Sequence, residues 1–120
     1  MQELFRFVKE YTIETIPGNV YETLLSHLRH YVSINESKFI EFFNNAHSIS
    51  RKSNIFTYFE HIGPKKAKEI ITERSNKAFL SYSDIEQRCK IENIESLIVN
   101  RLFLEMNAPE SQNLFVVNAV

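Results

Sequence analysis

The chain has 120 residues, of which 43% are hydrophobic and 24% are charged, and its formal net charge is −1. These values are typical of one globular domain and exclude a disordered chain or a collagen-like repeat. The presence of only two glycines and one cysteine excludes a glycine-rich nucleotide loop and an internal disulfide. No apolar run approaches the ~20 residues that cross a bilayer, so we expect a soluble, cytoplasmic protein with no membrane partner.

Residues 1–18 predict an N-terminal extension. Their apolar side chains alternate loosely with polar ones, which indicates one or two short strands. The apolar members of the pattern are Phe5, Phe7, Tyr11, Ile13 and Ile16. Pro17 and Gly18 end this segment, because both residue types interrupt regular structure.

Residues 19–47 predict two helices that pack on the core. The first begins with a capping-box pattern of Asn19 and Glu22 and carries one apolar stripe along its length. The second begins with the same pattern at Ser33 and Glu36. Its apolar residues are Phe39, Ile40, Phe43 and Ala46.

Residues 48–107 predict two successive units, each made of a helix, a tight break and a second helix. In the first unit, a helix is expected from near Ser50 to Glu60, followed by a break at residues 61–63. Pro64 suits the first position of the next helix, because its missing N–H group would have no partner there. This helix is expected to end near Ser75.

The second unit begins with a short helix whose capping box is Ser83 with Glu86. Residues 90–94 form its break, in which Asn93 is able to adopt a left-handed conformation, and the last helix follows. Residues 108–120 predict a tail in which the apolar residues from Leu114 to Val117 either form a short strand or pack on the core. The expected fold class is therefore mainly α, with two N-terminal helices followed by the two-unit segment and with short strands at both termini.

The first break resembles the helix-hairpin-helix motif, and residues 51–106 resemble the tandem form of that motif. Ile62 and Gly63 match its apolar residue and first glycine, and a basic helix containing alanine and isoleucine follows. Pro64 and Lys65 replace the second apolar residue and the second glycine of the fuller motif.

A turn of this kind suits a phosphate group for physical reasons as well. The start of a helix carries a partial positive charge and backbone N–H groups without partners. Glycine allows a nucleic-acid backbone to come close, and neighbouring lysines add positive charge. Such contacts position a protein without reading sequence. The predicted nucleic-acid-binding residues are Arg51, Lys52, His61, Ile62, Gly63, Lys65, Lys66, Lys68 and Arg74.

The charge distribution agrees with a local nucleic-acid footprint. Residues 51–90 contain nine lysines and arginines and five acidic residues, a net charge of +4, whereas residues 1–50 and 91–120 carry −2 and −3. The second break has Glu92 where a phosphate would be repelled, so its predicted role is structural. Arg88 and Lys90 are weaker candidates for a backbone contact.

No catalytic group, metal site or cofactor is predicted. His27 and His30 are three residues apart on a predicted helix, but no cysteine or carboxylate pair completes a zinc site. The lone Cys89 lies in an amphipathic stretch and is expected in the core. No nucleophile elbow or phosphate-binding loop occurs, so we expect a protein that is not an enzyme.

The order of segments from residue 19 to residue 117 resembles an archaeal family called domain of unknown function 655. The matching segments are Glu36–Ala46, Ile49–Arg51, the first hairpin, Phe79 to Arg88, Val99–Arg101 and Leu114–Val116. The resemblance implies an RNA-binding or ribosome-associated protein with a small OB-like barrel before the helix-hairpin-helix part. Its genes tend to lie among translation and ribosomal-RNA-modification genes. The first sixteen or so residues here are too few to close such a barrel.

The sequence thus favours a nucleic-acid-binding module that contacts the phosphate backbone. RNA, including ribosomal RNA, is favoured over DNA because of the family resemblance alone, and a ribosomal or other protein partner is compatible with it. Two alternatives stay open: a protein-docking module, and a DNA-binding accessory subunit of a repair or nuclease complex.

Overall fold

The computed structural model describes residues 18–47, 54–107 and 114–115. In chain order its elements are α2 (Gly18–Ile34), α3 (Glu36–Asn45), the short 3₁₀-helix η2 (Ile55–Tyr58), α4 (Pro64–Asn76), α5 (Tyr82–Cys89) and α6 (Ile94–Asn107). The predicted mainly α class is confirmed. The segments predicted as terminal strands lie almost wholly outside the described residues.

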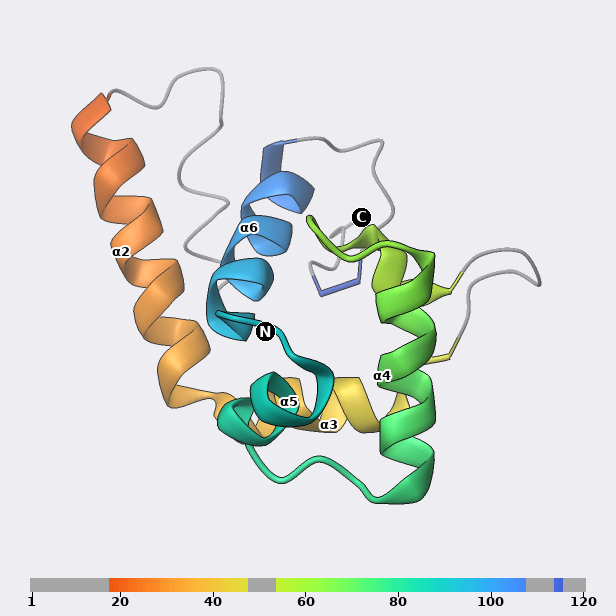
Figure 1. Cartoon of the computed structure of the whole chain (residues 1–120). Coiled ribbons are helices and arrows are strands. Elements are labelled where there is room, and N and C mark those ends of the chain that lie inside the picture. The colour runs from red at the N-terminus through yellow and green to blue at the C-terminus, as the bar shows by residue number, and fades with distance from the viewer. Residues whose placement is uncertain (1–17, 48–53, 108–113, 116–120) are drawn as a thin grey trace.

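The helices surround one apolar core (Figure 1). Helix α2 packs along α6, and α4 packs against both α5 and η2. Helices α3 and α5 lie together at one end of the bundle, as Figure 1 shows. No helix within the described ranges is both long enough and apolar enough to cross a membrane.

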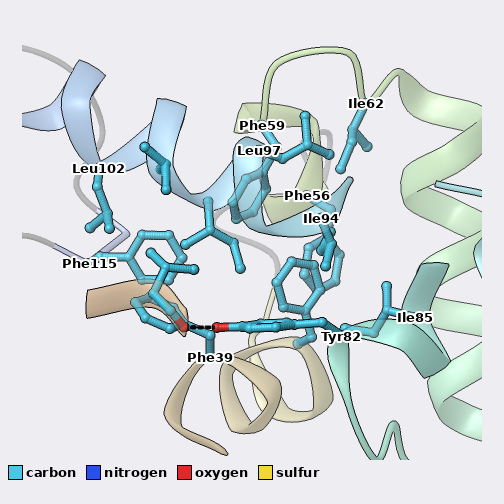
Figure 2. Close-up of a cluster of buried hydrophobic side chains, with 14 of the residues drawn as sticks. Phe39, Phe56, Phe59, Ile62, Tyr82, Ile85, Ile94, Leu97, Leu102 and Phe115 are labelled. Carbon is cyan, nitrogen blue, oxygen red and sulfur yellow. Dashed lines mark hydrogen bonds between the residues drawn. The ribbon is translucent and has the colours of Figure 1, made fainter. Parts of the chain in front are cut away.

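Aromatic rings fill the centre of this core. The ring of Phe43 stacks on those of Phe56 and Phe59, with centroids 5.2 and 5.5 Å apart. Phe115 reaches the same cluster from the C-terminal side, with its ring centroid 5.3 Å from that of Phe39 (Figure 2). Such ring pairs add to the free energy gained by burying their apolar surface. Cys89 is fully buried, as predicted, and burial raises the pKa of its thiol to about 11.

Two of the predicted helix starts are wrong in their capping. Glu36 does not pair with a serine of its own turn; its carboxylate accepts the backbone N–H of Tyr82, at 2.8 Å, where α5 begins. Glu86 likewise accepts the backbone N–H of Ile94, at 3.0 Å, where α6 begins. The residue that caps α5 is Ser81, whose hydroxyl accepts the N–H of Asp84. Glu36 therefore joins α3 to α5, which lies much later in the chain, and Glu86 joins α5 to the next helix, α6.

Two boundaries also differ from the prediction. Helix α2 begins at Gly18, one residue before Asn19. The helix expected up to Glu60 is, within the described residues, only the 3₁₀-helix η2, which starts after Asn54. The side chain of Asn54 accepts the N–H of Phe56 at 2.9 Å, and the chain turns after Tyr58. This early turn brings Phe59 into the core.

The hydroxyl of Tyr82 caps the C-terminal end of α2. It donates to the backbone carbonyl of Val32 at 2.6 Å, inside the core (Figure 2). Val32 is one of the last residues of α2, so its carbonyl has no partner within the helix. Burial raises the pKa of Tyr82, and the negative charges of Glu95 and Glu36 raise it further.

Replacing Tyr82 with phenylalanine should therefore lower the free energy of unfolding by about 1–3 kcal/mol, because the Val32 carbonyl stays buried without a donor. The contribution of the hydroxyl is complete below the pKa of an unfolded tyrosine, about 10, and is lost as the pH rises through the higher folded value. Urea denaturation between pH 7 and pH 11 measures both effects. If Tyr82→Phe loses the same free energy of unfolding at every pH, the predicted pH dependence of the hydroxyl's contribution is contradicted.

Candidate nucleic-acid interface

The turn between η2 and α4 carries the predicted site. Its left-handed residue is His61, with φ of 65°, whereas Gly63 has an extended conformation with φ of −86° and ψ of 179°. The turn therefore does not use the conformational freedom of glycine. A Cβ atom built on Gly63 meets no other atom within 4 Å. The fold itself has no need of glycine at this position.

The first turn of α4 leaves backbone donors open to solvent. Gly63 is the N-cap residue and has no side chain to accept a hydrogen bond, and Pro64 has no N–H group. The backbone N–H groups of Lys65 and Lys66 have no acceptor among the described residues. The carbonyl of Gly63 makes the first helical bond, accepting the N–H of Ala67 at 2.9 Å. Open donors at a positive helix end form an anion-binding geometry.

Two of the predicted lysines stand at this helix start. Lys65 and Lys68 are exposed and make no hydrogen bond or ion pair within the described part of the chain. His61 is also exposed, and its Nε2 lies 3.6 Å from Glu60 Oε1. Together with the open donors, Lys65 and Lys68 add positive charge to the turn, beside the carboxylate of Glu60.

Three other predicted site residues face the interior. Ile62 is a core residue. The Lys66 ammonium donates to the carbonyl of Cys89 at 2.5 Å and to Glu69 at 3.2 Å, so it closes the C-terminal end of α5. Arg74 donates to the carbonyl of Ala46 at 2.7 Å and so caps the C-terminal end of α3. The last two predicted residues, Arg51 and Lys52, lie outside the described residues.

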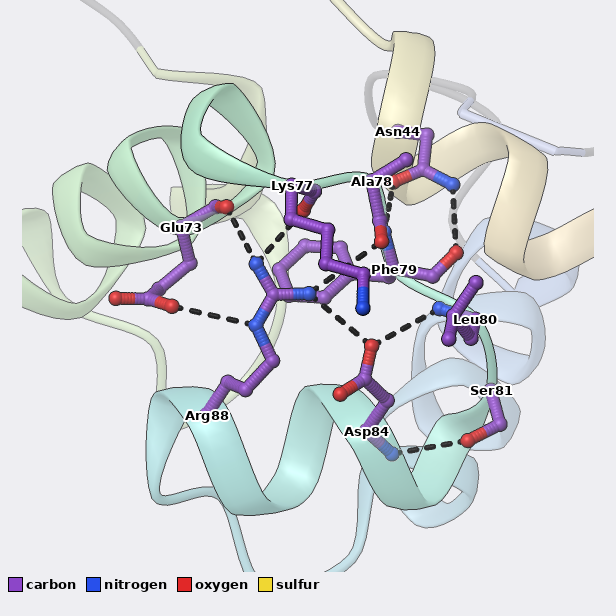
Figure 3. A network of polar contacts seen from close by, with 9 residues as sticks. All are labelled: Asn44, Glu73, Lys77, Ala78, Phe79, Leu80, Ser81, Asp84 and Arg88. Atoms are coloured by element: carbon purple, nitrogen blue, oxygen red, sulfur yellow. Dashed lines mark hydrogen bonds and ion pairs between the residues drawn. The ribbon is translucent and has the colours of Figure 1, made fainter.

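Arg88, a weaker candidate in the sequence, also makes its contacts within the fold (Figure 3). Its guanidinium donates to the carbonyls of Glu73 and Lys77 at the end of α4 and forms an ion pair with Asp84 at 3.1 Å. It also lies over the ring of Phe79, 4.6 Å from the centroid. Arg88 thus fixes the connection between α4 and α5.

The second turn, between α5 and α6, differs from the first. Lys90 has the left-handed conformation, with φ of 56°, so the prediction for Asn93 is wrong. Asn93 instead caps α6, its side chain accepting the N–H of Ser96 at 3.1 Å. With the carboxylate of Glu86 on the Ile94 N–H, two of the donors at the start of α6, those of Ile94 and Ser96, already have side-chain acceptors within the protein. This turn therefore offers no comparable anion site.

Two hollows lie beside these turns. The smaller, of about 430 Å³, separates the first turn at His61 and Ile62 from the second turn at Lys90. The larger, of about 990 Å³, lies between α2, η2 and α6. The side chains of Asn93, Ser96 and Asn100 line both hollows. No group of three or more potential metal-ligating residues occurs among the described residues.

These features define a mainly helical fold in which the turn before α4 carries exposed lysines and has no side-chain cap. The chain belongs to the family described as "Protein of unknown function (DUF655)", whose model matches residues 9–117. It is similar to the crystal structure of Af1531 from Archaeoglobus fulgidus, a protein of the same family model, with a TM-score of 0.79 and 31% sequence identity. The match covers 87% of this chain and 58% of that one. No curated protein matches the chain.

Proposed function

We propose that the chain binds the phosphate backbone of a nucleic acid at the start of α4, without reading sequence. The observation that carries this proposal is the glycine at the helix start, exposed at a position where the fold would accept a side chain. Absence of a side chain there leaves the N–H groups of Lys65 and Lys66 accessible to a phosphate oxygen. Lys65 and Lys68 would add charge-assisted contacts.

RNA is the proposed nucleic acid, in a cytoplasmic protein associated with the ribosome or ribosomal RNA, and it is proposed only on the family resemblance. The binding would need neither catalysis nor a cofactor. A protein-docking role is the second candidate, because the apolar side chains of Ile34 and Leu80 are 64% and 71% exposed. That role does not depend on the open donors of α4, so variants at Gly63 separate the two candidates.

Replacing Gly63 with aspartate tests the proposal, because it should leave the fold intact and weaken binding. The backbone of Gly63 is extended, as an N-cap residue requires, and aspartate is a good N-cap. Its carboxylate would accept the open N–H groups and repel a phosphate, so we expect a stability equal to or slightly above that of the wild type. The affinity for a short single-stranded RNA, measured by fluorescence anisotropy at low salt, should fall at least about tenfold.

Asparagine at position 63 is the matched control, because it has the shape of aspartate without the charge. We expect its affinity to lie between those of the wild type and the aspartate variant. A DNA strand of the same sequence, measured beside the RNA, tests the choice of nucleic acid. If the aspartate variant binds RNA as tightly as the wild type, the start of α4 is not the phosphate site.

A further inference from the structure

The larger hollow has the lining of a site for a flat, uncharged ring; we call it the aromatic cleft. Its aromatic walls are Tyr21 from α2, Tyr58 from η2 and Phe103 from α6. Tyr21 is 41% exposed and meets Phe103 edge-on, with ring centroids 5.0 Å apart. Tyr58 is half-buried, with the guanidinium of Arg101 5.5 Å from its ring centroid. These rings form a solvent-accessible surface of the kind on which a base stacks.

The polar groups of the aromatic cleft include both positive and negative charges. The carboxylates of Glu60 and Glu95 line it together with the guanidinium groups of Arg29 and Arg101, so the lining has no excess of positive charge that would attract a phosphate. Asn100 donates to Glu60 at 3.3 Å, and these two groups, with the Glu95 carboxylate, are of the type that forms hydrogen bonds with the amino and carbonyl groups of a base edge. The aromatic walls and the balanced charge of the aromatic cleft therefore suit a nucleobase.

The aromatic cleft adjoins the smaller hollow, which reaches the turn that carries the proposed phosphate site. Asn93, Ser96 and Asn100 form a shared wall between it and the smaller hollow, which begins at His61 and Ile62, next to Gly63. A strand whose phosphate lies at the start of α4 can thus pass along this wall. The second turn is less suited to the phosphate of an opposing strand, because Glu86 and Asn93 already accept the N–H groups of Ile94 and Ser96 at the start of α6.

We propose that the ligand is a single-stranded nucleic acid, bound with one unpaired base in the aromatic cleft. This inference rests on the proposed function, because the same strand supplies the phosphate at α4. A paired base is stacked inside a duplex and cannot enter the cleft unless it is flipped out. The aromatic cleft therefore makes the protein selective for single strands, although it reads no extended sequence.

The test compares three ligands of equal length by fluorescence anisotropy: a single-stranded RNA, the same strand as a duplex, and an abasic strand with an intact sugar-phosphate backbone. We expect the single strand to bind at least about tenfold more tightly than either of the others, as stacking of one base on an aromatic side chain implies. Replacing Tyr58 with leucine should remove most of this difference and leave the affinity for the abasic strand unchanged.

Tyr21→Leu provides a second variant with less effect on the core, because Tyr21 is more exposed than Tyr58. Tyr31→Leu is the matched control: Tyr31 also stands on α2, but it packs on Phe39 and does not line the aromatic cleft. Equal binding of natural and abasic strands, with both lost in Gly63→Asp, overturns the inference and leaves the proposed function standing. If none of the three ligands binds, the proposed function fails as well.

Discussion

Replacing Arg101 with alanine should lower the free energy of unfolding by about 3–5 kcal/mol, since the carboxylate of Glu105 would stay buried without this cation. Arg101 Nε lies 2.9 Å from Glu105 Oε2, and the two side chains are 4% and 0% exposed. Arg101 also donates to the carbonyl of Tyr58 at 2.9 Å, so η2 loses a contact too. Typical domains are stable by 5–15 kcal/mol, so this loss should be plain in urea denaturation followed by circular dichroism.

A double variant separates the charge from the hydrogen bonds. Arg101→Met with Glu105→Leu removes both ions, but the Glu105 carboxylate also accepts the backbone N–H groups of Leu114 and Phe115, at 2.8 and 3.0 Å. We therefore expect the double variant to recover only part of the stability lost by Arg101→Ala. Lys77→Met, at an exposed position, is the control and should stay within about 0.5 kcal/mol of the wild type. If Arg101→Ala is as stable as the wild type, the ion pair between Arg101 and Glu105 does not stabilise the core.

Reversing the charge of Lys65 and Lys68 together should weaken binding to single-stranded RNA by about 100-fold or more. Each charge-assisted contact contributes about 1.5–3 kcal/mol, and glutamate adds repulsion. The change should not harm the fold, because both side chains are exposed and acidic residues are favoured near the start of a helix. Lys66 is unsuitable for this experiment, because its ammonium holds the carbonyl of Cys89.

The control for that experiment is Lys38→Glu with Lys77→Glu, which changes the net charge equally at exposed positions away from the start of α4. We expect this variant to keep most of the wild-type affinity. The dependence of affinity on salt gives a second measurement, because the slope should decrease by about one for each phosphate contact removed. Equal affinity losses in the two double variants would show that only the net charge matters.

The sequence was sufficient to predict most of the helices, because apolar periodicity reports the buried face directly. It was insufficient for contacts between distant segments. Glu36 and Glu86 have the spacing of capping boxes, yet each caps the helix that packs against its own rather than the helix it belongs to. A local pattern identifies a carboxylate near a helix start, but only the packing decides which N–H group it meets.

In the candidate site, too, the sequence did not predict which side chains contact distant segments. The basic cluster in the sequence is real, but Lys66 and Arg74 point at carbonyl groups that end other helices, and Arg88 does so at α4. Cations at helix ends are stabilising, so a run of basic residues in a helical protein serves the fold before it serves a ligand. Only Lys65 and Lys68 remain as solvent-facing members of the predicted cluster on α4. The aromatic cleft could not be anticipated, because its walls come from three separate elements.

Phe115 delays the completion of the aromatic cluster while the protein is being synthesised. Its ring completes an aromatic cluster whose other members, Phe39, Phe42 and Phe59, are synthesised much earlier. At about 5–20 residues per second, roughly 3–11 s separate translation of residue 59 from that of residue 115. During that interval the nascent chain carries apolar rings that its own sequence cannot yet cover. The last step of core formation therefore has to follow the synthesis of residue 115.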